Sequence, residues 1–259
     1  MIPRNSYWNP VFPGSERYNF VQHALDAGYS VFFYDRLGSG LSDQYLLPLP
    51  PLSSFSNPSL TTFSPSPLTR VQFAPQVSIL ATLTRLLQLP SSPYTLNTRI
   101  RKVVQVGHSF GAFLSAAVLA TTDQSTSAGD GLVLTGFSGR FEWLSLFTSG
   151  GQARVAALQR PEKWGSLAHG YLVPVDQYSA AYGGFKSPFF EKRVAEWLYG
   201  AQKPFAIGEG LTGVTWPLDF GAIKVPVQVC SRPRSGFGVM MRGGADLKRG
   251  IRSCRDGMT

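Results

Sequence analysis

Histidine, cysteine and long apolar runs are scarce in this sequence, and each scarcity excludes a class of protein. The two cysteines, Cys230 and Cys254, permit at most one disulfide, so a disulfide-rich fold is excluded and we expect two reduced thiols. No spacing of cysteine and histidine resembles a metal site, and we expect neither a metal nor another cofactor. No window of about eighteen residues is apolar throughout, which predicts a chain without a membrane span.

The N-terminal sequence also lacks the pattern of an export signal. Residues 1–5 do not combine a basic start with an apolar run, so we expect a cytoplasmic protein. The chain does have length and apolar content, because 259 residues of which 43% are hydrophobic can bury one sizeable core. We therefore expect one α/β core with an inserted subdomain.

Acidic residues are few relative to basic ones, and the excess positive charge is concentrated towards the C-terminus. The net charge is +9, and residues 231–259 contain seven basic and two acidic residues. Phe237 is the one aromatic residue in this segment, which therefore lacks the interleaved rings that stack on bases. We predict a basic, disordered tail over 231–259 and no nucleic-acid partner.

Charge is absent altogether between residues 44 and 69, where proline and serine accumulate. Six of the nineteen prolines and six serines lie in this stretch, a composition that disfavours helices and strands. A structureless connection of this length is uncommon inside a compact domain. We predict that residues 45–68 are a surface insertion; a proline-rich docking segment is the second interpretation.

Apolar periodicity predicts alternating strands and helices on both sides of this insertion. Helices are expected over residues 16–27, 74–89 and 110–121, and strands over residues 29–34, 101–106, 131–135 and 223–230. Strands that alternate with helices form a mostly parallel sheet with helices on both faces.

The alternation stops between residues 140 and 213, where aromatic-rich helical segments are separated by glycines. Helices are expected over 141–147 and 188–199. We interpret this region as a helical cap inserted into the core. The predicted domains are core residues 1–139, the cap at 140–213, a core strand within 214–230 and the tail at 231–259.

Gly107-His108-Ser109-Phe110-Gly111 lies between a predicted strand and a predicted helix. This is the G-x-S-x-G pattern of a nucleophile elbow, in which small flanking residues allow the strand and the helix to approach closely. The turn presents the serine hydroxyl at the helix N-terminus, where backbone N–H groups and the helix dipole stabilise an oxyanion. We predict that Ser109 is a nucleophile and that the Phe110 N–H is an oxyanion donor.

Two segments together resemble the α/β-hydrolase superfamily, and most closely its capped, fungal-type, single-domain members. They are GYSVFFYDRLGSGLS at residues 28–42 and VGHSFG at residues 106–111, and the pair Tyr7-Trp8 is also similar. The resemblance covers about residues 7–43 and 71–230. It implies a partial α/β-hydrolase fold, with a mostly parallel sheet and a helical cap, in which Asp35 and its glycine turn are structural supports.

The sequence departs from that family at two places. The family has an oxyanion strand before the aromatic pair, and it has an acid and then a histidine after the strand that matches residues 225–230. Here no such strand precedes Tyr7, no carboxylate occurs in residues 231–236, and no histidine follows His169. We therefore expect a gap in the sheet between residues 29–34 and 101–106, and the catalytic acid and histidine are not identified.

The three histidines have different expected roles. We expect His108 to line the substrate pocket beside Ser109 rather than to act as the base, and His23 to lie on the surface. His169 belongs to the cap and is a weak candidate for the base. The resemblance implies that aromatic residues of the cap form the substrate pocket: Trp143, Phe147, Trp164, Tyr171, Phe189 and Trp197.

The sequence leaves two functions open. The first is a serine hydrolase that cleaves a carboxylic ester, thioester or lactone of a small apolar substrate, with no obligate protein partner. The second is a catalytically impaired or inactive homologue: a pseudoenzyme, a ligand-binding remnant or the product of an incorrectly assembled gene. Dinucleotide binding at Gly38-Ser39-Gly40 is disfavoured, because Asp43 stands where that motif has its third glycine.

Overall fold

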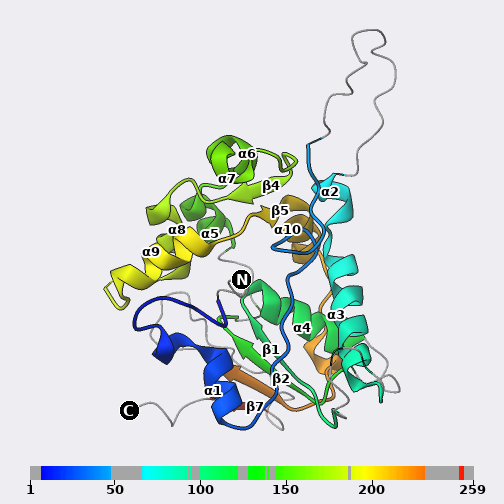
Figure 1. Cartoon of the computed structure of the whole chain (residues 1–259). Coiled ribbons are helices and arrows are strands. Elements are labelled where there is room, and N and C mark those ends of the chain that lie inside the picture. The colour runs from blue at the N-terminus through cyan, green and yellow to red at the C-terminus, as the bar shows by residue number, and fades with distance from the viewer. Residues whose placement is uncertain are drawn as a thin grey trace, which may run out of the picture. The chain divides into compact units, whose positions relative to one another are not determined.

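A computed structural model gives the fold of the chain as two compact units (Figure 1). It describes residues 7–47, 66–90, 92, 94, 100–121, 128–137, 139, 144–185 and 188–230, and the backbone of 251–253. Unit 1 comprises Met1–Gln72 and Leu144–Leu211, and unit 2 comprises Phe73–Trp143 and Thr212–Thr259. The domain boundaries expected from the sequence stay a prediction.

Unit 2 contains a parallel sheet of four short strands in the order β1-β2-β6-β7. These are β1 (Val104–His108), β2 (Gly131–Thr135), β6 (Val227–Cys230) and β7 (Ile251–Ser253). The register pairs His108 with Thr135, and Thr135 with Cys230. Because the strands are parallel, their carboxyl ends lie at one edge of the sheet, where α/β proteins place their sites.

The helix α4 (Phe110–Thr121) packs on this sheet and forms the centre of the unit 2 core. It contacts β1, β2, α3 (Phe73–Gln88) and the 3₁₀ turn η3 (Phe220–Ala222). Every residue from Ala112 to Leu119 is buried, because α4 has apolar or small side chains on all its faces. The ring of Phe73 stacks on that of Phe113 with their centroids 4.5 Å apart, which joins α3 to α4.

The predicted elements of unit 2 agree with the structure where the local pattern is strong. The bounds of α4 and β2 are those predicted, and α3 differs from the prediction by one residue at each end. β1 begins three residues later than predicted, because the Val103 N–H donates to the Asp130 side chain over 2.8 Å instead of to a neighbouring strand. The sequence predicted no element after residue 230, yet the backbone of Ile251–Ser253 pairs with β6.

The second half of unit 1 contains a small antiparallel sheet among short helices (Figure 1). Its strands are β3 (Arg154–Val155), β4 (Tyr171–Val173) and β5 (Phe205–Ala206), and its helices are α5 (Leu144–Gly151), α6 (Ala156–Gln159), α7 (Pro161–Trp164), α8 (Gln177–Gly184), α9 (Lys192–Ala201) and α10 (Ile207–Val214), which continues into unit 2. The sequence predicted helices alone in this region. Strands of two or three residues are too short to show an alternating pattern.

The first half of unit 1 has less regular structure than predicted. The predicted helix over 16–27 is divided into η1 (Glu16–Tyr18) and α1 (Phe20–Asp26), because the Asn19 side chain accepts from the Gln22 N–H and caps α1. The predicted buried strand over 29–34 is wrong: Tyr29 is 69% exposed, and no described strand of unit 1 pairs with this segment. A segment rich in β-branched and aromatic residues forms a strand only where a neighbouring strand supplies hydrogen-bond partners for its backbone.

The turn that follows is organised by Asp35, as the resemblance implied. The Asp35 carboxylate accepts from the Leu41 N–H over 2.8 Å, and the Ser42 hydroxyl donates to the Asp35 carbonyl. Gly40 has φ +61°, and a Cβ at this position would overlap the Asp35 carboxylate. Glycine is therefore needed here both for conformation and for space.

Both ends of the predicted insertion are structured. Leu46 pairs with Leu167 in an isolated antiparallel bridge, and the Leu47 N–H donates to the Ser166 carbonyl over 2.8 Å. At the other end, Ser66 caps the helix α2 (Pro67–Arg70). The expectation that residues 45–68 contain no regular structure is thus wrong at its ends, and residues 48–65 lie outside the described residues.

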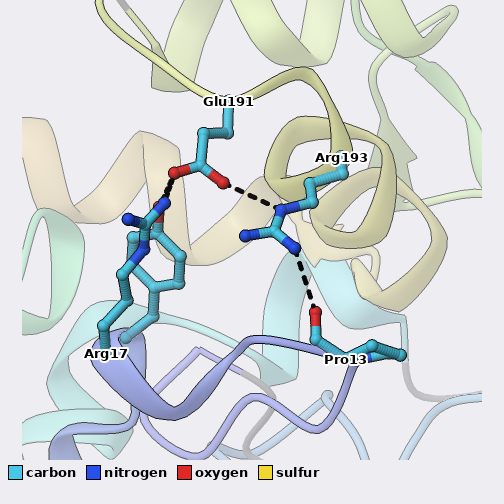
Figure 2. Close-up of polar contacts among 5 residues, drawn as sticks. Pro13, Arg17, Glu191 and Arg193 are labelled. Carbon is cyan, nitrogen blue, oxygen red and sulfur yellow. Dashed lines mark hydrogen bonds and ion pairs between the residues drawn. The ribbon is translucent and has the colours of Figure 1, made fainter.

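Glu191, immediately before α9, fastens the N-terminal segment within unit 1 (Figure 2). Its carboxylate forms an ion pair with Arg17 and accepts from Arg193 Nε over 2.8 Å and from the Tyr18 hydroxyl over 2.7 Å. Arg193 also donates to the carbonyl of Pro13 over 3.2 Å. One carboxylate thus joins residues that are more than 170 positions apart in sequence.

Candidate active site

Ser109 lies on the turn between β1 and α4, at the carboxyl edge of the unit 2 sheet. Its side chain is exposed, and its φ of +52° is in the left-handed region that serine seldom adopts. The Ser109 N–H donates to the Thr135 carbonyl over 2.9 Å, and the Ser109 carbonyl accepts from the Ala112 N–H over 3.0 Å. These bonds hold a conformation that costs about 1–3 kcal/mol for a residue other than glycine.

The two glycines that flank Ser109 have different roles. A Cβ on Gly107 would lie 2.5 Å from Ala112 Cα and from the Gly111 carbonyl oxygen, so the expected close approach of strand and helix is confirmed there. A Cβ on Gly111 would meet no atom within 4 Å. The expectation that Gly111 must be small to leave space is therefore wrong, because this residue sits on the outer side of the first helical turn.

Phe110 is the first residue of α4, so its backbone N–H belongs to the helix N-terminus. The first N–H groups of a helix point out along its axis, where the dipole favours negative charge. The Phe110 ring is fixed by edge-to-face contacts, with its centroid 5.5 Å from that of Phe73 and 6.4 Å from that of Phe113. The Phe110 ring, and with it the first residue of α4, is thus anchored to the aromatic core of unit 2.

His108 ends β1 and is held by the residues that end β2. Its Nδ1 lies 3.0 Å from the Thr135 hydroxyl oxygen, and the same hydroxyl donates to the Gly107 carbonyl over 3.2 Å. A hydroxyl has one hydrogen to donate, so it accepts at the His108 bond and Nδ1 carries the proton. Burial lowers the pKa of His108, which favours the neutral imidazole.

Gly136 makes room for this imidazole. It has φ +56°, and a Cβ at this position would overlap His108 Cε1 and lie 2.9 Å from Nδ1. Sequence reasoning did not single out Thr135 or Gly136. The signal was available, since residues that end neighbouring parallel strands meet at the same edge of the sheet.

Two carboxylates occur in the described part of unit 2, and each accepts a hydrogen bond from a backbone N–H group. Asp130 precedes β2 at the amino edge of the sheet, opposite to Ser109, and accepts from the Val103 N–H. A parallel strand of five residues spans roughly 16 Å, so the two edges are far apart. Asp219 is exposed and accepts from the Gly221 N–H over 2.8 Å. The structure therefore identifies no acid for a triad among these residues.

The other predicted site residues belong to unit 1 or lie outside the described residues. His23 is exposed on α1, as expected, and His169 is also exposed. Among the aromatic residues predicted to line a pocket, Trp164 and Tyr171 are buried in the unit 1 core, Phe147 and Phe189 are exposed, and Trp143 is outside the described residues. Their binding role and that of His108 stay predictions.

The described residues hold no group of three or more side chains that could bind a metal ion. Within the same residues, none of the helices has the length and apolar character that crossing a membrane would require. The chemistry available at the elbow is that of an exposed hydroxyl beside the positive end of a helix.

Comparison with known proteins assigns a family to this arrangement. Residues 4–250 match the family model described as "Alpha/beta hydrolase family", whereas no curated protein matches the sequence. The match extends over nearly the whole chain, and the described core has the parallel strands, the strand–serine–helix turn and the covering helices of a partial α/β-hydrolase fold. The chain therefore belongs to the alpha/beta hydrolase family, a family of hydrolase-type enzymes.

Proposed function

We propose that this protein is a serine hydrolase that cleaves a carboxylic ester, thioester or lactone of a small apolar substrate. The observation that carries the proposal is the backbone of Ser109, whose φ of +52° presents an exposed hydroxyl at the N-terminus of α4. A strained, hydrogen-bonded turn is maintained at a functional site more often than elsewhere.

In the proposed reaction, Ser109 Oγ attacks the acyl carbon and loses its proton to a base. Negative charge then develops on the former carbonyl oxygen, where the Phe110 N–H and the dipole of α4 stabilise it. The alcohol or thiol leaves with a proton, and water hydrolyses the acyl-serine by the reverse sequence of steps. The net reaction consumes one water and releases one acid.

None of the described residues around Ser109 is assigned as the base. A base needs an acceptor atom within hydrogen-bond reach of Ser109 Oγ. Thr135 holds His108 at Nδ1, so Nε2 is the atom of this ring that could accept, and Asp130 accepts from the Val103 N–H at the other edge of the sheet. A triad without its base retains only the rate that substrate binding and oxyanion stabilisation supply.

The apolar character of the proposed substrate is supported by the aromatic residues around α4. The rings of Phe110, Phe113 and Phe73 are in mutual contact, and Trp216 contacts Phe73 with a centroid separation of 5.2 Å. Phe137, which follows β2 at the edge of the sheet that carries Ser109, stacks on Phe113. Phe73 and Phe113 are buried in the core, so the apolar surface available to an acyl chain beside Ser109 would come from the partly buried rings of Phe110 and Phe137.

A fluorophosphonate probe tests the proposal, because it forms a covalent bond only with an activated serine. We expect labelling of the wild type and none of Ser109→Ala. Ser115→Ala is the matched control, since Ser115 lies on the same helix but is buried, and this variant should be labelled as the wild type is. A series of 4-nitrophenyl esters of increasing acyl length then tests the apolar preference.

Folded wild-type protein that resists the probe would instead support the inactive homologue. Circular dichroism shows whether each sample is folded, so that loss of labelling is not confused with loss of structure.

A further inference from the structure

Two cationic side chains of unit 1, Arg160 and Lys163, lie beside aromatic rings, away from Ser109 in sequence. The guanidinium carbon of Arg160 lies 5.0 Å from the ring centroid of Trp164 and 5.2 Å from that of Tyr199. The Lys163 ammonium lies 4.8 Å from the Trp164 ring. Lys203 is close enough to disfavour the charged form of Lys163.

Not every N–H group of the Arg160 guanidinium has a hydrogen-bond acceptor among the described residues. Its Nη1 is buried and has no hydrogen-bond partner within the described part of the chain. The carboxylate paired with it, Glu162, lies 3.6 Å from Nε, and 69% of the Glu162 side chain is exposed to water. Buried donors normally have an acceptor, and this guanidinium nitrogen has none among the described residues.

The positive charge of this cluster also exceeds the negative charge beside it. Burial, Arg160 and Lys203 all lower the pKa of Lys163, and Glu162 only partly opposes them. The Lys163 ammonium donates to the Gly200 carbonyl over 2.8 Å, and this bond fixes its position. An ammonium has three N–H groups, so it can also donate to an anion. Three cations and one exposed carboxylate leave a site at which an anion would be favoured.

We propose that Arg160, Lys163 and Lys203 form a binding site for a small oxyanion, a phosphate or carboxylate group carried by a small molecule. A guanidinium presents its N–H groups as a planar fork that matches both kinds of oxyanion. The rings of Trp164 and Tyr199 hold that fork in one orientation, so less freedom is lost when the anion binds. This site does not depend on the function proposed for Ser109.

A nucleic acid fits this cluster less well than a small oxyanion. Binding of single strands relies on aromatic faces on which bases stack. Trp164 is only 6% exposed and its ring is already in contact with two cations, so it offers no open face.

Calorimetric titration of the full chain with inorganic phosphate at low ionic strength tests the site. Lys163→Gln and Lys203→Gln remove a cation and leave the packing of Arg160 on the rings in place. We expect each variant to bind phosphate at least about tenfold more weakly, because a hydrogen bond to a charged group contributes at least this much. The same titration with acetate distinguishes a carboxylate from a phosphate preference.

Lys192→Gln is the matched control, since Lys192 is an exposed cation of the same unit that pairs with Glu196. Its phosphate affinity should equal that of the wild type. The proposal is overturned if neither anion binds the folded wild type, or if the three variants bind phosphate equally. The second result would mean that Arg160 only braces Trp164 and Tyr199.

Discussion

His108 and Thr135 are joined by a 3.0 Å hydrogen bond that links the last residues of two neighbouring parallel strands. The same Thr135 accepts from the Ser109 N–H at its carbonyl and donates its hydroxyl to the Gly107 carbonyl. Three consecutive residues of the elbow are therefore bound to one residue of β2. The position of the proposed nucleophile depends on this strand as well as on its own turn.

The ring tautomer of His108 is the first prediction. With Thr135 accepting from Nδ1, a long-range ¹H–¹⁵N spectrum should show Nδ1 protonated and Nε2 unprotonated at neutral pH. Thr135→Ser should keep this pattern, whereas Thr135→Val should lose it and lower the free energy of unfolding by about 0.5–1.5 kcal/mol. A wild-type spectrum with the proton on Nε2 would contradict the assignment.

Stability should depend on pH through His108. Burial lowers the pKa of His108 below its ordinary value of 6.5, so the unfolded chain takes up this proton at a higher pH than the folded chain. The free energy of unfolding should thus fall as pH drops below about 6.5, by at most about 1.4 kcal/mol per pH unit, and level off below the folded pKa.

Urea denaturation of the wild type and of His108→Gln between pH 7.5 and 5 measures this contribution. The difference in the free energy of unfolding between the wild type and His108→Gln should shrink or reverse in sign as pH falls. A difference that is constant over this range would show that His108 titrates alike in both states.

The two glycines of the elbow offer a matched pair of substitutions. Gly107→Ala should lower the free energy of unfolding by about 1–3 kcal/mol, because its Cβ would meet backbone atoms that cannot move independently. Gly111→Ala should be neutral or stabilising by up to about 1 kcal/mol, because alanine favours the helix and nothing opposes its Cβ. Equal effects of the two substitutions in thermal or urea unfolding would argue against the described turn.

Two tyrosines of unit 1 should respond oppositely to loss of the hydroxyl. The Tyr34 hydroxyl is buried without a hydrogen-bond partner in the described structure, and burial is the main cause that raises the pKa of Tyr34 to about 12. Tyr34→Phe should therefore be neutral or stabilising, since it removes an unsatisfied polar group. Tyr171→Phe should cost about 0.5–1.5 kcal/mol, because the Tyr171 hydroxyl accepts from the Tyr45 N–H over 3.1 Å.

Urea unfolding of both variants checks this pair, and the ultraviolet absorbance of the wild type at high pH checks the ionisation of Tyr34. Destabilisation by Tyr34→Phe equal to that of Tyr171→Phe would mean that Tyr34 has a partner.

Predictions from the sequence succeeded where a pattern is local and long. The apolar residues of Phe110–Thr121 specify a buried helix by themselves, and the run Gly131–Thr135 specifies a buried strand. The start of β1 could not be predicted in the same way, because it is decided by Asp130, a residue 27 positions from Val103. The segment 29–34 has the composition of a strand but no described neighbour with which to pair.

The residues of the candidate site also fall into those that a local sequence pattern predicts and those that only the tertiary structure reveals. Its motif residues were evident, because a glycine, a serine and a small residue between a strand and a helix form a local signal. Thr135 and Gly136 were not, because their contact with His108 is created by the register of two strands. The cluster around Arg160 was also hidden, since Tyr199 and Lys203 are distant from Arg160 in sequence.

The sequence by itself determined the strand–serine–helix turn and the family, because both depend on residues that are adjacent in the chain. Only the tertiary structure decided that Gly107 is spatially required and Gly111 is not, and that Thr135 holds His108 and Ser109 together. The physical reason is that packing and hydrogen bonds act between neighbours in space. A sequence pattern reports those neighbours only where the chain also makes them neighbours in sequence.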